Sequence, residues 1–128
     1  MRILLDTHAL LWWLLGDGNL STAAKAAIGD ERNEVLVSAA SAWEIATKFR
    51  LGKLAGAGRI AADIRGCLRS QGFVELAIAV EDGQRAGSLV GLHRDPFDRM
   101  LAAQALRLDV TIVSNNELLD LFAVRRVW

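Results

Sequence analysis

Short apolar segments rich in β-branched residues alternate along this chain with segments of helical periodicity. Strands that read as continuous apolar runs are typical of a parallel sheet buried on both faces, and helical connections make successive strands parallel. The alternation therefore predicts an α/β fold in three layers, with a short central parallel sheet flanked by helices on both faces. We expect strands at 2–6, 35–38, 73–77, 110–113 and 124–128, helices at 7–15, 22–28, 39–51, 59–70, 80–92 and 96–108, and a helical turn at 117–121.

Composition limits the class of protein. Residues 1–128 have the length of one domain with one proper core, and the 52% hydrophobic content favours a folded chain over a disordered one. The 15 basic and 15 acidic residues balance to a net charge of zero. No overall field therefore attracts nucleic acid, and any such contact depends on a local basic patch.

The sequence also bears on the compartment. With a single cysteine, Cys67, no internal disulfide can form, which fits a reducing environment. The chain enters its first expected strand without a basic leader, and no apolar run approaches the roughly 20 residues that a transmembrane helix needs. We therefore expect a cytoplasmic protein that makes no contact with a membrane.

Three acidic residues stand at the ends of these segments, where a carboxylate has little structural purpose. Asp6 ends the first expected strand, Glu44 lies in the helix after the second, and Asp98 begins the helix at 96–108. The carboxyl ends of parallel strands meet at one edge of a sheet, where ligands bind, so these acids can converge. Converging carboxylates repel one another, and a divalent ion that prefers oxygen ligands, Mg²⁺ or Mn²⁺, offsets the repulsion. Asp6, Glu44 and Asp98 are therefore our candidate metal ligands and catalytic residues.

Each acid also has a purely structural interpretation. Asp6 can cap the helix that follows it, and Glu44 can form an ion pair with Lys48 one helical turn later. Asp98 stands in the first turn of its helix, although Asp95 already supplies an N-cap there. Taken one at a time, these interpretations compete with a metal site, but together they leave the convergence of three acids unexplained.

The histidines and tryptophans are expected to have structural roles. His8 and His93 are isolated, so a place in the core or on the surface is a better expectation than metal ligation. Trp12 and Trp13 make the first helix apolar nearly all round, so that helix is either deeply buried or part of an interface. Trp43 is expected in the core.

The segments around the three acids resemble those of the PIN-domain nucleases, and among these the toxins of VapBC-type toxin–antitoxin systems. The segment LLDTH at 4–8 is similar to the one that carries the family's first acid, and SAWEIA at 41–46 to the one that carries the second. The segment HRDPFDRMLAAQA at 93–105 resembles the third, with Asp98 as its acid. The ending VTIVSNN at 110–116 resembles the strand and turn that carry a Thr or Ser and then a fourth acid. The resemblance covers essentially the whole chain and implies a PIN-like fold.

The fourth acidic position departs from the family pattern, because Asn116 stands there. An amide oxygen can ligate a metal ion or hold its water, but it brings no charge, so binding of a second ion is put in doubt. Asn116 can instead cap the helical turn that follows it, and Ser114 with Glu117 also matches a Ser-x-x-Glu capping box.

The resemblance implies an endoribonuclease dependent on Mg²⁺ or Mn²⁺ that hydrolyses RNA phosphodiester bonds and inhibits translation. Glu44 is expected to orient or deprotonate the attacking water, while Thr7 and Ser114 donate hydrogen bonds to ligand carboxylates or to phosphate. Three basic residues are either contacts to RNA phosphates or ordinary surface residues, namely Lys48, Arg94 and Arg99.

The same resemblance implies a small VapB-like antitoxin as partner and a homodimer. Two other classes of protein are alternatives to a PIN-domain nuclease. A catalytically silent PIN-like module that binds RNA or protein is the alternative that Asn116 keeps open. A phosphoacceptor receiver domain needs an acid after its central strand, and Val37-Ser38 offers none.

Overall fold

The computed structural model describes residues 1–128 and contains one five-stranded sheet. Its strands run in the order β3-β2-β1-β4-β5, and every neighbouring pair is parallel. This confirms the predicted α/β fold. The strands are β1 (Arg2–Leu5), β2 (Glu34–Ser38), β3 (Val74–Leu76), β4 (Thr111–Val113) and β5 (Arg126–Val127).

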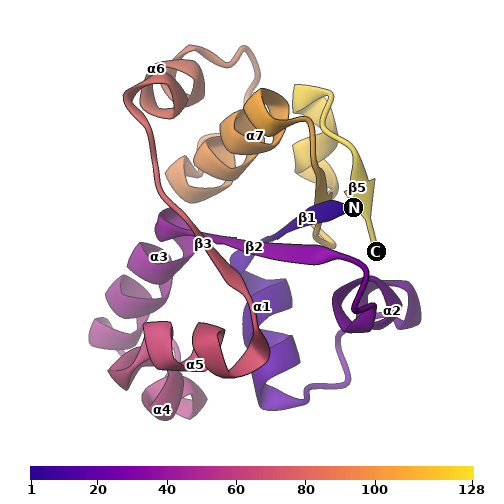
Figure 1. Cartoon of the computed structure of the whole chain (residues 1–128). Coiled ribbons are helices and arrows are strands. Elements are labelled where there is room, and N and C mark those ends of the chain that lie inside the picture. The colour runs from indigo at the N-terminus through magenta and orange to yellow at the C-terminus, as the bar shows by residue number, and fades with distance from the viewer.

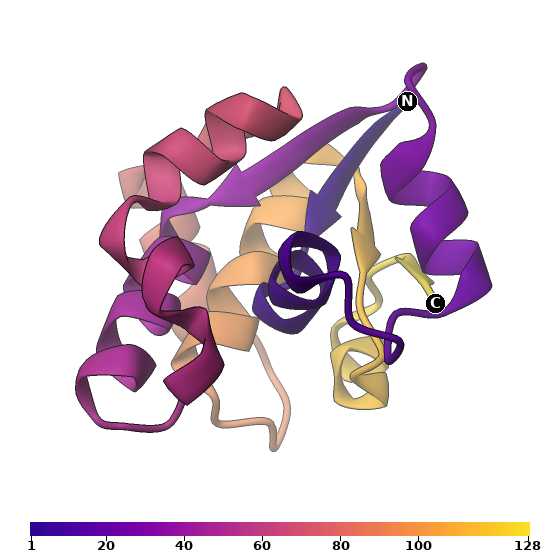
Figure 2. The same ribbon diagram turned by 90° about the horizontal axis from the view of Figure 1, so that it is seen from below.

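Helices cover both faces of the sheet and make three layers (Figure 1). On one face, α1 lies in the middle, with α2 to one side and α3, α4 and α5 to the other (Figure 2). That face carries α1 (Thr7–Leu15), α2 (Thr22–Gly29), α3 (Ala39–Arg50), the 3₁₀ helix η1 (Ala55–Ala57), α4 (Gly58–Ala62) and α5 (Ile64–Gln71). The other face carries α6 (Val80–Ser88), α7 (Pro96–Leu108) and the 3₁₀ helix η2 (Glu117–Phe122).

Alternation of side chains along β1 builds the two cores. Ile3 and Leu5 point toward α1 and α2, whereas Leu4 points toward α7 and η2, and all three side chains are fully buried. Successive residues of a strand face opposite sides of the sheet, so a strand covered on both faces must be apolar throughout. The central strand is therefore held from both sides, which fixes the position of its carboxyl end.

Caps determine where the helices beside that end begin. Asp6 is the N-cap of α1, and its Oδ1 accepts a hydrogen bond of 2.7 Å from the backbone N–H of Ala9. Asp95 caps α7 by accepting from the backbone N–H groups of Phe97 and Asp98. Both caps were predicted from the sequence as structural interpretations, and both are confirmed.

The helix predicted at 59–70 is wrong as a single element, because the chain leaves helical geometry at Asp63 and divides into α4 and α5. Asp63 is extended, and its carboxylate accepts from the backbone N–H of Gly66 to start α5. An aspartate that can cap a new helix competes with continuing the old one. The helix predicted at 80–92 also ends early, at Ser88.

The tryptophans differ in their burial. Trp12 and Trp13 are partly buried, and Trp12 lies 5.6 Å from the ring of Trp128 between centroids. Trp43 is 61% exposed, so its predicted place in the core is wrong. It lies on the outer side of α3, beyond the face that packs Ile45 against the sheet. No helix of this fold has the length and apolar character needed to cross a membrane.

Candidate active site

The structure brings the three candidate carboxylates to one edge of the sheet. Asp6 follows β1 directly, and α3, which carries Glu44, packs against both α1 and α7. Asp98 lies in the first turn of α7. The negative charge of Asp98 contributes to a raised pKa of Asp6, and the charge of Glu44 contributes to a raised pKa of Asp98. The three acids are therefore close enough to influence one another electrostatically.

Asp6 is deeply buried, with 4% of its surface exposed, against 3% for Glu44. Burial is the main cause that raises its pKa, because a charged carboxylate loses solvation inside the protein. Hydrogen bonds from the Ser114 hydroxyl and the Ala9 N–H oppose this effect. Its own backbone N–H donates to the carbonyl of Val113 at the end of β4. Asp6 is thus both the helix cap that was expected and a buried acid at the strand end.

Asp98 is held by side chains from two other segments. One of its oxygens, Oδ2, lies 2.8 Å from Nε2 of His93 and accepts a hydrogen bond of 2.9 Å from Nδ2 of Asn116. Burial is again the largest cause that raises the pKa of Asp98, opposed by the hydrogen bond with His93, while the charges of Asp95 and Glu44 add to the rise. No role at this site was predicted for His93, which stands five residues before Asp98 and reaches it through the fold of the intervening residues.

Glu44 is buried, yet its carboxylate is paired. Its Oε2 lies 2.5 Å from Nζ of Lys48, and their side chains are 5% and 31% exposed, respectively. The ion pair with Lys48, which is the structural interpretation of Glu44, therefore forms, and it lies at the edge of the site. Lys48 is consequently a neighbour of the carboxylates, and its charge offsets part of theirs.

The expected supporting residues lie beside the acids. Thr7 donates a hydrogen bond of 3.1 Å to the hydroxyl of Ser41, which joins the starts of α1 and α3 rather than contacting a carboxylate. Ser114 is fully buried, bonds to Asp6, and accepts a hydrogen bond from the N–H of Asn116. Asn116 uses its oxygen to cap η2 at Leu118, while its amide nitrogen faces Asp98. The structure therefore shows both the capping role and the position next to the acids.

Arg99 does not have the role predicted for it. Its guanidinium donates to the backbone carbonyl oxygens of Ala86, Leu89 and His93, and it lies 5.5 Å from the centroid of the Phe122 ring. These hydrogen bonds fix the loop between α6 and α7, and they occupy the N–H groups of Arg99 within the protein. This corrects the expectation that Arg99 reaches RNA phosphates.

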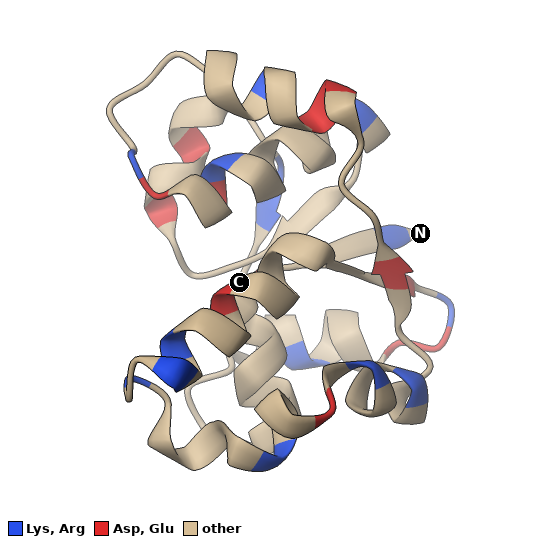
Figure 3. Ribbon diagram, turned by 90° about the vertical axis from the view of Figure 1, so that its left-hand side faces the viewer, with Lys and Arg blue, Asp and Glu red and all other residues tan.

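Arg94 is exposed on the same loop, so it remains available to a ligand. Basic and acidic positions are interspersed over the side of the molecule in Figure 3, without a continuous basic face there. A contact with a polyanion at this edge therefore depends on individual cations such as Arg94 and Lys48.

The chemistry of the donor set fits a hard divalent ion, because the buried carboxylates of Asp6 and Glu44 lie with the partly buried carboxylate of Asp98. As the side chains stand, however, no three acidic, histidine or cysteine residues form a group arranged to hold a metal ion. The oxygens are turned instead toward hydrogen-bond donors on His93, Asn116 and Lys48. Metal ligation by all three acids therefore requires these side chains to reorient.

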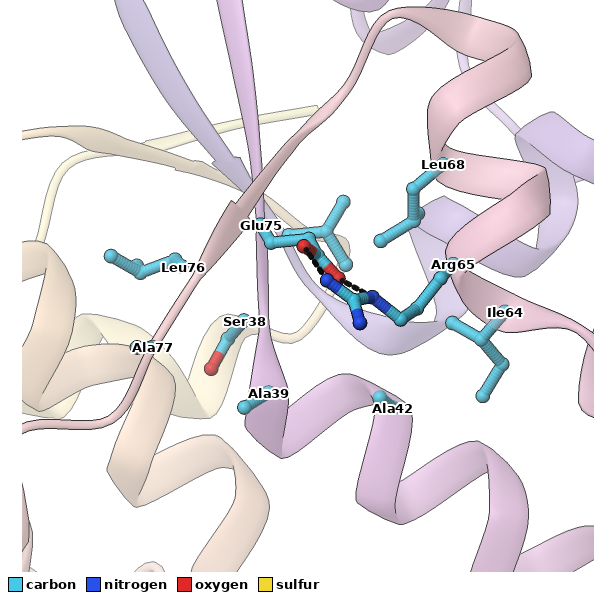
Figure 4. Close-up of a pocket in the computed structure, with 10 residues that line it drawn as sticks. Ser38, Ala39, Ala42, Ile64, Arg65, Leu68, Glu75, Leu76 and Ala77 are labelled. Carbon is cyan, nitrogen blue, oxygen red and sulfur yellow. Dashed lines mark hydrogen bonds and ion pairs between the residues drawn. The ribbon is translucent and has the colours of Figure 1, made fainter.

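An apolar cavity near the strand ends is separate from the acids. A cavity of about 500 Å³ lies between α3, α5 and β3, and it is lined mainly by apolar side chains (Figure 4). Across it, Arg65 forms a two-point ion pair with Glu75, at 2.7 and 2.9 Å. None of the three carboxylates lines this cavity, so the candidate active site is defined by its acids and not by a deep pocket.

A parallel α/β sheet with buried acids at the carboxyl end of its central strand defines the class of this protein. The sequence model of the PIN domain matches residues 3–124, and the chain belongs to that family. Ribonuclease VapC16 from Mycobacterium tuberculosis is 63% identical over 30 residues. That match spans 23% of this chain and 21% of the relative, so it relates only a fifth of the relative's length to this protein.

Solved structures share the whole fold at low sequence identity. VapBC2 from Rickettsia felis, bound to a DNA fragment from its promoter, matches with a TM-score of 0.72 at 14% identity and covers 99% of this chain and 98% of its own. VapBC-1 from nontypeable Haemophilus influenzae gives 0.67 at 14% identity, with 99% and 97% covered. Mycobacterium tuberculosis VapC20, a toxin that cleaves the sarcin–ricin loop, gives 0.59 at 18% identity, with 91% and 92% covered. These matches confirm the PIN-like fold.

Proposed function

We propose that this chain is a metal-dependent endoribonuclease, the toxin component of a VapBC-type toxin–antitoxin system, which hydrolyses RNA phosphodiester bonds and thereby inhibits translation. The observation that carries the proposal is that Asp98 adds to the raised pKa of Asp6, and Glu44 to that of Asp98, at the end of β1 in a PIN domain. Neighbouring carboxylates that repel one another reduce stability, and a bound divalent ion offsets the repulsion and can act in catalysis. We propose Mg²⁺ as that ion, with Mn²⁺ as its substitute.

Asp6, Glu44 and Asp98 would hold the ion, which when bound supplies charge stabilisation at the phosphate and lowers the pKa of water. Side chains of the protein position the reacting groups and accept the proton. Glu44 orients the attacking water or accepts its proton, and Ser114 holds Asp6 in place. His93 and Asn116 orient Asp98 from two sides of the site.

Contacts to the RNA backbone are assigned to Arg94 and Lys48. Arg94 is exposed beside the acids, and Lys48 keeps about a third of its side chain accessible while paired with Glu44. Phosphate contacts of this kind position a nucleic acid without reading its sequence. With a net charge of zero, binding rests on these few cations and is expected to weaken with added salt.

We also propose a VapB-like antitoxin as partner, a homodimer as the free toxin, and the cytoplasm as the compartment. Two of the structural relatives are toxin–antitoxin complexes, which supports the first of these. The partly buried Trp12 and Trp13 leave apolar surface on α1 for self-association.

Cleavage of a mixed RNA pool by purified protein tests the proposed activity. Wild type with Mg²⁺ should cleave, chelation should stop cleavage, and Asp6→Asn should reduce it by about 100-fold or more, the scale for loss of a preorganised charged group. Asparagine keeps the cap of α1, so the fold should survive the change. If RNA binds but remains intact with every divalent ion tried, the chain is instead the silent PIN-like binding module that Asn116 suggests.

A further inference from the structure

An aromatic pair of one exposed and one partly buried ring joins the two helices that carry Glu44 and Asp98. Trp43 of α3 and Phe97 of α7 meet edge to face, with ring centroids 4.8 Å apart and planes at 74°. Each precedes one of the acids, since Glu44 follows Trp43 and Asp98 follows Phe97. The pair therefore lies between the two helices that carry Glu44 and Asp98, and Trp43 keeps 61% of its surface exposed. Nothing in the proposed cleavage chemistry requires such an exposed indole.

The two rings form part of a hollow that we call the Trp43 pocket. It has a volume of about 230 Å³ and lies between α3, α6 and α7. Ile78 and Met100 add apolar surface to it, and the exposed Arg94 stands among its lining residues. The Trp43 pocket thus combines flat aromatic surface, apolar side walls and one cation next to the place where a phosphodiester would be cleaved.

The pocket is held in shape by bonds that already exist in the protein. Arg99, which also lines it, ties together carbonyl oxygens of α6 and of the following loop. Asp95 caps α7 and thereby fixes the turn that presents Phe97. A pocket whose walls are bonded in this way needs little reordering to accept a ligand, so less free energy is lost on binding.

We propose that the Trp43 pocket binds one unpaired nucleobase of the RNA substrate, next to the scissile phosphodiester, while Arg94 contacts an adjoining phosphate. This rests on the proposed nuclease function and names its substrate class. Every base has an apolar face that can pack on an aromatic ring, worth about 1–3 kcal/mol per base in proteins that bind single strands. The small volume and the position beside the acids favour a base over a protein segment.

The proposal restricts the RNA that can be cut. A base enters such a pocket only when it is unstacked, because in a duplex both of its faces are covered by neighbours. The substrate is therefore a single-stranded segment or a loop, and one position near the cut must carry a base.

The test compares intact RNA with RNA lacking one base. Fluorescence anisotropy measures binding of single-stranded RNA hexamers in Ca²⁺, with RNA integrity checked on a gel, and an abasic residue is placed at each position in turn. Wild type should lose about tenfold in affinity at one position, near the lower end of the range for base stacking. Trp43→Ala should bind intact RNA about tenfold more weakly and lose nothing further at that position, whereas Trp43→Phe should keep most of the affinity.

Phe49→Ala is the matched control, because Phe49 is an exposed aromatic on the same helix and does not line the pocket. It should bind like wild type. Parallel cleavage assays in Mg²⁺ separate the two proposals. If wild type cleaves RNA and Trp43→Ala binds and cleaves equally well, the base pocket is wrong and the nuclease stands. If wild type neither binds nor cleaves RNA, the proposed nuclease function is wrong, and the proposed base pocket is wrong as well. If Trp43→Ala alters only self-association in light scattering, the surface is a protein interface and the proposal is overturned.

Discussion

Asp6 and Asp98 face the same site but are held there in different ways. Asp6 is positioned by its own strand and helix, through a cap to Ala9 and a backbone bond to Val113 in the neighbouring strand. Asp98 is oriented by His93 in the preceding loop and by Asn116 near the end of the chain. Asp6 belongs to a deeply buried part of the fold, whereas Asp98 depends on hydrogen bonds with the side chains of His93 and Asn116. Substitutions around Asp98 can therefore change the site without unfolding the protein.

The largest effect is expected where α6 is joined to α7, the helix that carries Asp98. Asp82 of α6 is fully buried, accepts from the N–H of Ala79 and forms an ion pair with Arg107 of α7. Burial opposes ionisation, but Arg107 and Ala79 outweigh it and lower the pKa of Asp82. Asp82→Ala leaves these donors without a partner and should lower the free energy of unfolding by about 3 kcal/mol.

Thermal and urea unfolding measure that loss. Asp109→Ala, which removes the exposed partner of Arg125, is the control and should change stability far less. Because the pKa of Asp82 is lowered in the folded state, its contribution is present above the unfolded value near 4 and disappears as the pH falls through the folded value. Equal effects of the two substitutions would show that α6 does not depend on its buried ion pair.

The next largest effect is expected at Asn116, whose amide nitrogen donates to Asp98. Asn116→Asp restores an acid at the fourth position, so attraction to a bound divalent ion increases more than repulsion among the acids. Calorimetric titration should show binding of Mg²⁺ or Mn²⁺ tightened by about tenfold, near 1.4 kcal/mol. The same change should make the metal-free protein slightly less stable, because a donor to Asp98 becomes a negative charge. Coinciding titrations for the two proteins would leave Asn116 only as the cap of η2.

The smallest expected effect concerns the charge of Asp98 itself. The pKa of Asp98 is raised in the folded protein, mainly by burial. The protonated carboxyl group therefore costs no stability below the unfolded pKa near 4, and stability is lost as the pH rises through the folded pKa and the group ionises. Asp98→Asn should therefore stabilise the metal-free protein at neutral pH, by about 1 kcal/mol, and the difference should vanish in acid.

Melting curves in chelator across this pH range test the prediction. Asp6→Asn should shift stability in the same direction, since burial raises the pKa of Asp6 as well. A loss of stability in Asp98→Asn at neutral pH would mean that its charge near the start of α7 outweighs the repulsion.

Much of the frame could be predicted because its causes are local. The apolar run before Asp6 specifies a strand buried on both faces, and alternation with helices specifies a parallel sheet whose ends meet at one edge. Asp6 and Asp95 mark the starts of helices, because each accepts a hydrogen bond from a backbone N–H two or three residues later. The family motifs added a prediction of which acids form the site, and the match of a PIN domain over residues 3–124 confirms the family.

What the sequence determined by itself is thus the sheet, its order of helices and the edge where the acids collect, because short-range hydrogen bonds and side-chain periodicity dictate these. Only the tertiary structure decided that Arg99 binds carbonyl groups rather than RNA, that His93 reaches Asp98, and that Trp43 lies exposed. These outcomes depend on how the loop between α6 and α7 packs against α3 and η2. Such contacts cross a loop or join separate elements, so their geometry is set by the packing of whole elements and leaves no periodic trace in the sequence.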